Sequence, residues 1–320
     1  MIYVLRFAII ACLGLLFGTT ASAAPLNFYG VSERGNFYSV SYEAGTGVTS
    51  TFVKNLATTA YYYGALDYGP NGSLYMLRGA GGTSTNPGQL YSLSGDGNFT
   101  PTLVNLGTGN VLSGMNMGPA SSAGTAAGLA FKPDGTFYAG TGVRFVSPQN
   151  RTALFLVDPA PDPTRLDFFW DDYTPAFGAA SIQGLQWYND QLLALTATGD
   201  SDPSLHLRTI THGLTGGTVY DSSANLDAGG LGDATFMTPG DLAIIEDTLF
   251  AAVGPDLYTY DWGSGAPWTH LGTLPEPFTG LASLPGQTIP SPVPEPGNAL
   301  LSGAAVLGLI LYSRRARPVC

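Results

Sequence analysis

Carboxylates supply most of the side chains in this sequence that could do chemistry. They are scattered along the chain, but two clusters stand out: Asp158, Asp162, Asp171 and Asp172 form the first, and Asp200 and Asp202 form the second. Such oxygens suit Ca²⁺, which is a hard ion, and two carboxylates that face each other can cleave a glycosidic bond. No twelve-residue Ca²⁺-binding loop occurs in the sequence. We therefore expect solvated aspartates in turns, no metal site and no cofactor, with bound Ca²⁺ as the alternative.

The other reactive residue types form no catalytic pattern. The histidines, His206, His212 and His270, lack the His-Glu-x-x-His spacing of a zinc site. No Gly-x-Ser-x-Gly elbow, phosphate-binding loop or complete dinucleotide-binding fingerprint is present. We therefore expect no catalytic residue and no enzyme. The alternative is a glycosidase or lyase that acts on extracellular polysaccharide through a pair of carboxylates.

The first 23 residues have the layout of a secretory signal peptide. Arg6 precedes an apolar run over residues 7–17, and the small residues Ala21 and Ala23 mark a cleavage site. The run is shorter than the ~20 residues that span a bilayer, which disfavours a retained membrane anchor. We expect the Sec machinery to export the chain and signal peptidase to cleave it after Ala23.

The other end of the chain carries three features in a row. Pro294, Glu295 and Pro296 come first, and an uncharged apolar segment over residues 299–312 follows. Three arginines then close the sequence, Arg314, Arg315 and Arg317. The segment is a short transmembrane helix candidate, and the arginines predict that its far end stays in the cytoplasm.

This tail, residues 291–320, resembles the PEP-CTERM sorting signal of Gram-negative bacteria. The resemblance implies that an exosortase, a membrane-bound cysteine peptidase, recognises Pro294, Glu295 and Pro296 and removes the tail. It also implies an inner-membrane-anchored precursor whose cargo then moves to the cell surface or the extracellular matrix. A plain single-pass anchor is the alternative. The resemblance concerns routing and leaves the function of the body open.

Cysteine and charge separate the two ends from the body. Both cysteines, Cys12 and Cys320, lie in the removable segments, so the body has no disulfide. The body keeps eight basic residues against 22 acidic ones, a net charge of −14. Such a surface repels nucleic acid, which requires basic groups, and it suits neutral polysaccharide or cations better than acidic polymers.

The body contains a repeat of strands and turns. Five leucines, each one or two residues after a glycine, mark the leading strand of a unit: Leu66, Leu129, Leu185, Leu242 and Leu281. A tight turn such as Pro70-Asn71-Gly72 or Pro133-Asp134-Gly135 comes next, and a second strand follows. Pro-Asn-Gly and Pro-Asp-Gly favour a type I turn with the glycine at positive φ.

Five leading strands predict an all-β, five-bladed propeller over residues 24–290. The N-terminal strands at 26–31, 36–42 and 48–56 lack a leading strand, whereas residues 280–284 form a leading strand without followers. Together they would complete one blade and close the ring. A β-sandwich is the alternative fold. Two glycine-rich stretches, 107–128 and 211–239, do not fit the repeat and are either ligand-contacting loops or passive surface excursions.

We therefore predict an exported binding or structural protein of unknown ligand, with extracellular polysaccharide as a candidate partner and no nucleic-acid partner. A Ca²⁺-stabilised adhesin and the propeller glycosidase or lyase remain as rivals.

Overall fold

The computed structural model describes the body of the chain in fifteen segments. These are residues 24–32, 34–56, 63–78, 89–104, 126–141, 144–146, 149–151, 154–157, 166–168, 181–197, 205–212, 220–222, 231, 239–261 and 267–287. The body, Pro25–Thr288, is a compact unit. Ala21, Ala23, the Pro294-Glu295-Pro296 motif, the apolar segment and the three arginines lie outside the described residues. Within the described ranges, no helix has the length and apolarity needed to cross a bilayer.

Five four-stranded antiparallel sheets make up the body. The closing blade has the order β22-β1-β2-β3 and joins both ends of the body, with bounds Phe278–Ser283, Leu26–Ser32, Asn36–Glu43 and Gly47–Asn55. The second blade is β4 to β7: Tyr63–Tyr68, Leu74–Arg78, Gln89–Leu93 and Pro101–Leu103. The third is β8, β9, β12 and β13: Ala126–Phe131, Phe137–Thr141, Leu154–Val157 and Leu166–Phe168.

Two further blades and one hairpin complete the strands. The fourth blade is β14 to β17: Ser181–Tyr188, Gln191–Ala197, Leu205–His212 and Tyr220–Ser222. The fifth is β18 to β21: Gly240–Ile245, Thr248–Val253, Asp256–Asp261 and Thr269–Thr273. A separate hairpin pairs β10 (Arg144–Val146) with β11 (Gln149–Arg151).

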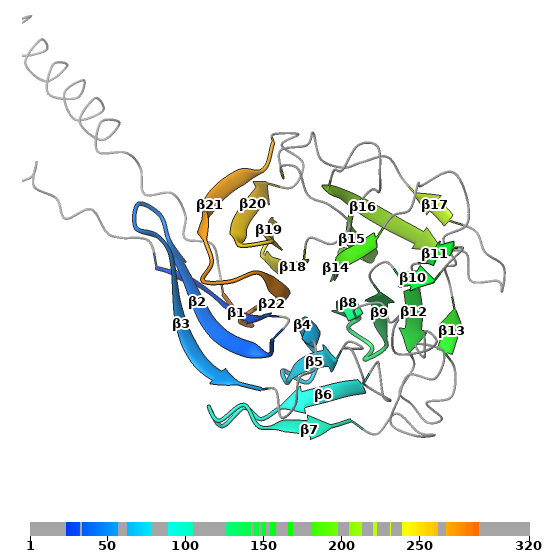
Figure 1. Ribbon diagram of the computed structural model, residues 1–320, viewed down its shortest axis with the longest axis horizontal. Helices are drawn as coiled ribbons and strands as arrows, with labels where there is room; N and C mark the ends of the chain where they lie inside the picture. The colour runs from blue at the N-terminus through cyan, green and yellow to red at the C-terminus, as the bar shows by residue number, and fades with distance from the viewer. Residues whose placement is uncertain are drawn as a thin grey trace, which may run out of the picture. The chain divides into compact units, whose positions relative to one another are not determined.

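The first strands of the five blades form a closed ring. Each of β4, β8, β14, β18 and β22 contacts the next, and β22 contacts β4. Figure 1 looks onto this ring, with the five strands gathered at its centre and the other strands of each blade further out. The prediction of an all-β, five-bladed propeller is confirmed, and the β-sandwich alternative is wrong because the sheets stack radially instead of forming two facing layers.

The two ends of the body complete the closing blade as the repeat predicts. Strand β22 pairs antiparallel with β1 from Phe28↔Ser283 to Ser32↔Phe278. Beyond the strands, the side-chain amide of Gln287 imitates one more pair: Asn27 N donates to Gln287 Oε1 at 2.6 Å, and Gln287 Nε2 donates to Asn27 O at 2.6 Å. The ring is therefore closed by hydrogen bonds between residues 260 apart in sequence.

The repeat leucines and glycines bring the inner strands close together. All five leucines are buried, with at most 1% of each exposed. A Cβ on Gly184 would lie 2.6 Å from the Cα of Asp241, and one on Gly280 would lie 2.9 Å from the amide nitrogen of Leu66. Glycine is required at these positions because backbone of the neighbouring blade occupies the space of a side chain.

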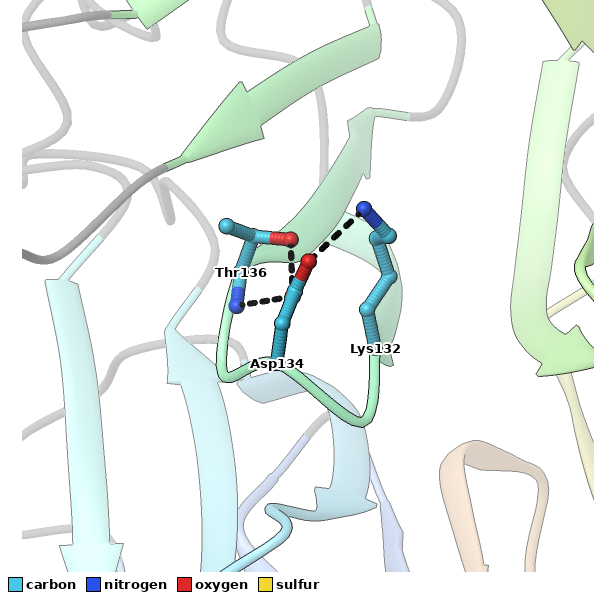
Figure 2. Close-up of polar contacts among 3 residues, drawn as sticks. All are labelled: Lys132, Asp134 and Thr136. Carbon is cyan, nitrogen blue, oxygen red and sulfur yellow. Dashed lines mark hydrogen bonds and ion pairs between the residues drawn. The ribbon is translucent and has the colours of Figure 1, made fainter.

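The predicted turns have the geometry that their residues favour. Gly72 and Gly135 have φ of 75° and 93°. In the second turn, Asp134 Oδ1 accepts hydrogen bonds from Thr136 N (2.9 Å) and Thr136 Oγ1 (2.6 Å). Lys132 Nζ pairs with Asp134 Oδ2 at 3.0 Å, as Figure 2 shows. These local contacts fix the hairpin that begins the third blade.

One prediction about irregular chain was wrong in part. Residues 211–239 were expected to lie outside the repeat, yet Thr211 and His212 end β16, and Tyr220–Ser222 form β17. Strand β17 pairs with β16 as the outermost strand of the fourth blade. The signal in the sequence is weak because a strand of three residues covers too few positions to show a period.

The inner strands run parallel, which gives the ring two distinct faces. Gly240 approaches Gln183, and each lies two residues before its repeat leucine. At the other end of the strands, Asp67 contacts Phe131. Asp67 lies one residue after the repeat leucine of β4, and Phe131 lies two residues after that of β8. Residues at equivalent positions therefore meet, so the connections from first to second and from third to fourth strands start and end on one face, which we call the turn face. The remaining connections start and end on the other face, the loop face.

The two faces differ strongly in the length of their connections. On the turn face the connections between described strands have two to eight residues. On the loop face five connections have 10 to 22 residues: 79–88, 104–125, 142–153, 169–180 and 223–239. The insertions of this chain therefore start and end on one side of the ring.

Candidate functional site

Two carboxylates from the inner strands lie buried at the centre of the ring. Asp67 follows the repeat leucine of β4, and Asp241 precedes the repeat leucine of β18. Asp67 is 8% exposed and Asp241 is fully buried. Among the described residues no basic side chain pairs with either carboxylate.

Asp67 links the second blade to the third. Its Oδ1 accepts a hydrogen bond from its neighbour Tyr68 N at 2.8 Å. Its Oδ2 accepts one from Phe131 N at 2.8 Å, at the end of β8. The side chain thus satisfies an amide that the inner edge of β8 would otherwise leave without a partner, since an inner strand has no neighbour on its channel side.

Asp241 links the fifth blade to the closing blade and the second. Its Oδ1 accepts from Leu242 N at 2.9 Å, and its Oδ2 accepts from Leu281 N in β22 at 2.9 Å. The amide of Leu66 in β4 also hydrogen-bonds to this carboxylate. Gly184 in β14 makes room for it, because its missing side chain would occupy the position of Asp241.

Burial makes both carboxylates weak acids. Desolvation raises the pKa of Asp67 from 3.8 to about 7, and its hydrogen bonds from Phe131 and Tyr68 offset part of that rise. The pKa of Asp241 is raised well above 3.8, mainly by burial and in small part by repulsion from Asp67. The two groups are therefore close enough to disfavour simultaneous ionisation.

This arrangement holds the ring together through its centre. Between them, Asp67 and Asp241 connect β4 to β8, β18 to β22 and β18 to β4. A glycosidase needs its two carboxyl groups open to substrate, whereas these oxygens are buried and bonded to backbone amides. The geometry supports a structural role for the pair.

Sequence reasoning did not single out Asp67 or Asp241. The available signal was small, because among the five repeats only these two place a carboxylate directly beside the leucine on an inner strand. The acidic residues that were singled out, Asp158, Asp162, Asp171, Asp172, Asp200 and Asp202, lie outside the described residues.

All three histidines lie on strands, two on β16 and one on β21. His270 on β21 is a surface residue whose Nε2 lies 3.1 Å from Asp256 Oδ1 and whose ring packs edge-on against Tyr258. His206 and His212 are on β16. Over the described segments, no group of three or more His, Cys, Asp or Glu residues is placed to hold a metal ion.

Comparisons with known proteins give fold likenesses at low identity. No protein-family model matches the chain, and no curated protein matches its sequence. A thermostable family-43 glycoside hydrolase is similar over 87% of this chain and 97% of its own, with 11% identity and a TM-score of 0.44.

Two proteins from Bacteroides caccae are similar as well. One, of unknown function, matches 76% of this chain and 71% of its own, with 9% identity and a TM-score of 0.38. The other belongs to the DUF4784 family, from strain ATCC 43185, and matches 81% and 73%, with 10% identity and a TM-score of 0.36. The strand pairing of the chain itself therefore carries its assignment as a β-propeller protein.

Proposed function

We propose that this β-propeller is an exported cell-surface or extracellular-matrix protein that acts by binding, and that its C-terminal tail is a sorting signal cut by exosortase. The observation that carries the binding role is the difference between the two faces of the ring. Five connections of 10 to 22 residues arise on the loop face, against at most eight residues on the turn face. Loops on a rigid scaffold are where proteins place ligand contacts.

The geometry at the centre of the ring supports binding over catalysis. Among the described residues, Asp67 and Asp241 are the buried carboxylates, and each is bonded to amides of two or more strands. The rival proposal, a propeller glycosidase or lyase, would need a different acidic pair that is open to polysaccharide. Assaying the exported protein for release of reducing sugar from polysaccharides tests this rival directly, and sustained release would overturn the non-enzymatic role.

The routing part of the proposal is carried by the tail. Pro294, Glu295 and Pro296, the apolar segment 299–312 and the three arginines occur in the order that a PEP-CTERM signal has. Signal peptidase and the Sec machinery would act at the other end, at Ala21 and Ala23.

Replacing the motif tests the routing. In a strain that has exosortase, the triple variant Pro294→Ala, Glu295→Ala and Pro296→Ala should keep its tail, and intact mass of the exported protein would show it. The matched control, Pro290→Ala with Pro292→Ala, removes two nearby prolines outside the motif and should be processed normally. Normal removal of the tail from the triple variant would contradict the routing.

A further inference from the structure

An exposed aromatic ring and a fixed carboxylate both contact Tyr38, on the loop-face half of the closing blade. We call this group, Asn36, Tyr38, Phe52, Asn55 and Glu276, the rim patch. Asn36 begins β2 and Asn55 ends β3, so both lie where these strands reach the loop face. Glu276 is in the short connection from β21 to β22 on the same face. Residues 240 apart in sequence therefore meet there.

Phe52 is the aromatic part of the rim patch. Its side chain is 53% exposed, and in the described part of the chain only Leu103 is another exposed large hydrophobic residue. Phe52 packs edge-on against Tyr38 with ring centroids 5.6 Å apart, and Tyr38 in turn stacks on buried Phe278 at 5.5 Å. The ring is thus supported from the core side while half of it stays open to solvent.

Glu276 is the polar part, and its position is fixed by three side chains. Its Oε1 accepts hydrogen bonds from Asn36 Nδ2 at 2.7 Å and Tyr38 Oη at 2.8 Å. Asn55 Nδ2 donates to Asn36 Oδ1 at 2.7 Å and orients that amide. Burial and the neighbouring Glu276 raise the pKa of Tyr38 to about 12, so Tyr38 keeps its proton and remains a donor. No described residue donates to the second carboxylate oxygen, Oε2.

We propose that the rim patch is a subsite for a neutral polysaccharide, and this rests on the binding role proposed above. A sugar ring has an apolar C–H face, which Phe52 can cover, and hydroxyl groups at its edge, one of which can donate to Glu276 Oε2. An apolar aromatic face combined with a few fixed polar groups is typical of ligand sites. The net charge of −14 on the body disfavours anionic polymers at the same place.

The open side of Phe52 favours a sugar over a cationic peptide at this subsite. Glu276 alone would attract either ligand, because both donors that reach it are neutral and leave its charge uncompensated. The exposed ring and the amides of Asn36 and Asn55 are neutral contacts, and such contacts suit the C–H face and the hydroxyls of a sugar.

Affinity electrophoresis of the exported protein through gels containing laminarin or dextran tests the proposal. We expect retardation by at least one of these neutral glucans and none by alginate, which is anionic. Phe52→Ala should weaken the apparent affinity about tenfold, and Phe52→Tyr should retain it because the ring remains. Glu276→Ala should weaken binding, whereas Glu276→Gln keeps an acceptor oxygen and should lose less. Leu103→Ala is the matched control, since it removes another exposed hydrophobic side chain from β7, outside the rim patch.

The outcomes separate this subsite from the proposed function. Each variant should unfold in one cooperative transition well above the assay temperature, which shows that any lost retardation is not misfolding. Binding that survives Phe52→Ala would overturn the rim patch and leave the binding role intact. Absence of retardation by both neutral glucans, or stronger binding to a lysine-rich peptide than to glucan, would overturn the ligand class. Failure of tail removal bears only on routing.

Discussion

At the scale of single residues, the carboxylate of Asp241 has the most demanding position in the ring. Amides from its own strand, from β22 and from β4 converge on it, and it is fully buried. Hydrogen bonds from amides favour the charged form, but desolvation is larger and raises the pKa. Asp67 repeats this arrangement with two amides. The centre of the ring therefore depends on two carboxylates that retain protons more readily than ordinary aspartates.

This predicts that stability falls as pH rises from about 4 to about 7. Folded Asp67 holds its proton up to pH about 7, whereas the unfolded chain releases it near 3.8. The folded state therefore binds more protons in this window, and the free energy of unfolding decreases with pH, by up to about 4 kcal/mol from Asp67. Asp241 contributes with the same sign. Urea unfolding at pH 5 and pH 8 measures the change.

Substitution isolates the contribution of Asp67. Asp67→Asn should be less stable than the parent at pH 5, because one amide loses its acceptor, and the difference should shrink or reverse at pH 8. The matched control is Asp134→Asn: its turn contacts lower the pKa of Asp134, so it is ionised throughout this range. The control should lose the same stability at both pH values. An equal loss at both pH values for Asp67→Asn would contradict the assigned pKa.

At the scale of elements, glycines on the inner strands let neighbouring blades approach closely. Gly184 and Gly280 allow β14 and β22 to approach the backbone of β18 and β4 within the space of one methyl group. The repeat glycine and leucine divide two tasks: the glycine permits contact between neighbouring inner strands, and the leucine fills the layer between blades. The loop-face ends of β2 and β3 then place Asn36 and Asn55 beside Glu276.

Gly184→Ala should therefore destabilise the ring. Its Cβ would lie 2.6 Å from the Cα of Asp241 and 2.9 Å from the amide nitrogen of Leu242, both backbone atoms that can move only with β18. We expect a loss of about 2–3 kcal/mol in the free energy of unfolding. Gly95→Ala is the control, because a Cβ there meets no atom within 4 Å. Equal stability of the two variants in urea unfolding would show that the inner strands can separate freely.

At the scale of the whole body, the ring is closed by pairing between its two ends. Strand β22 ends and β1 begins on the turn face, opposite the long connections, and Gln287 binds both backbone groups of Asn27 there. A ring without a disulfide is held shut by this blade and by the buried contacts on each side of it. The contacts between Gln287 and Asn27 that close the ring therefore lie on the face opposite the long connections.

Gln287→Ala tests how much the hydrogen bonds between Gln287 and Asn27 contribute to the stability of the ring. The variant loses both hydrogen bonds to Asn27, and we expect the free energy of unfolding to fall by about 1–2 kcal/mol. Hydrogen exchange of the Asn27 amide should become faster as the end of the blade frays. Gln191→Ala, at an exposed position at the start of β15, should leave both measurements unchanged. Unchanged exchange at Asn27 in the Gln287 variant would mean that the strand pairing alone closes the ring.

The sequence by itself determined the blades, their number and the way the ring closes. Turn chemistry at Gly72 and Gly135 and the period of the repeat leucines are local, so they can be read along the chain. Only the tertiary structure decided which side chains meet. Asp67 reaches an amide 64 residues away, and Glu276 holds Asn36 across 240 residues. Such contacts follow from the radial stacking of blades, which sets distances that no spacing along the sequence encodes.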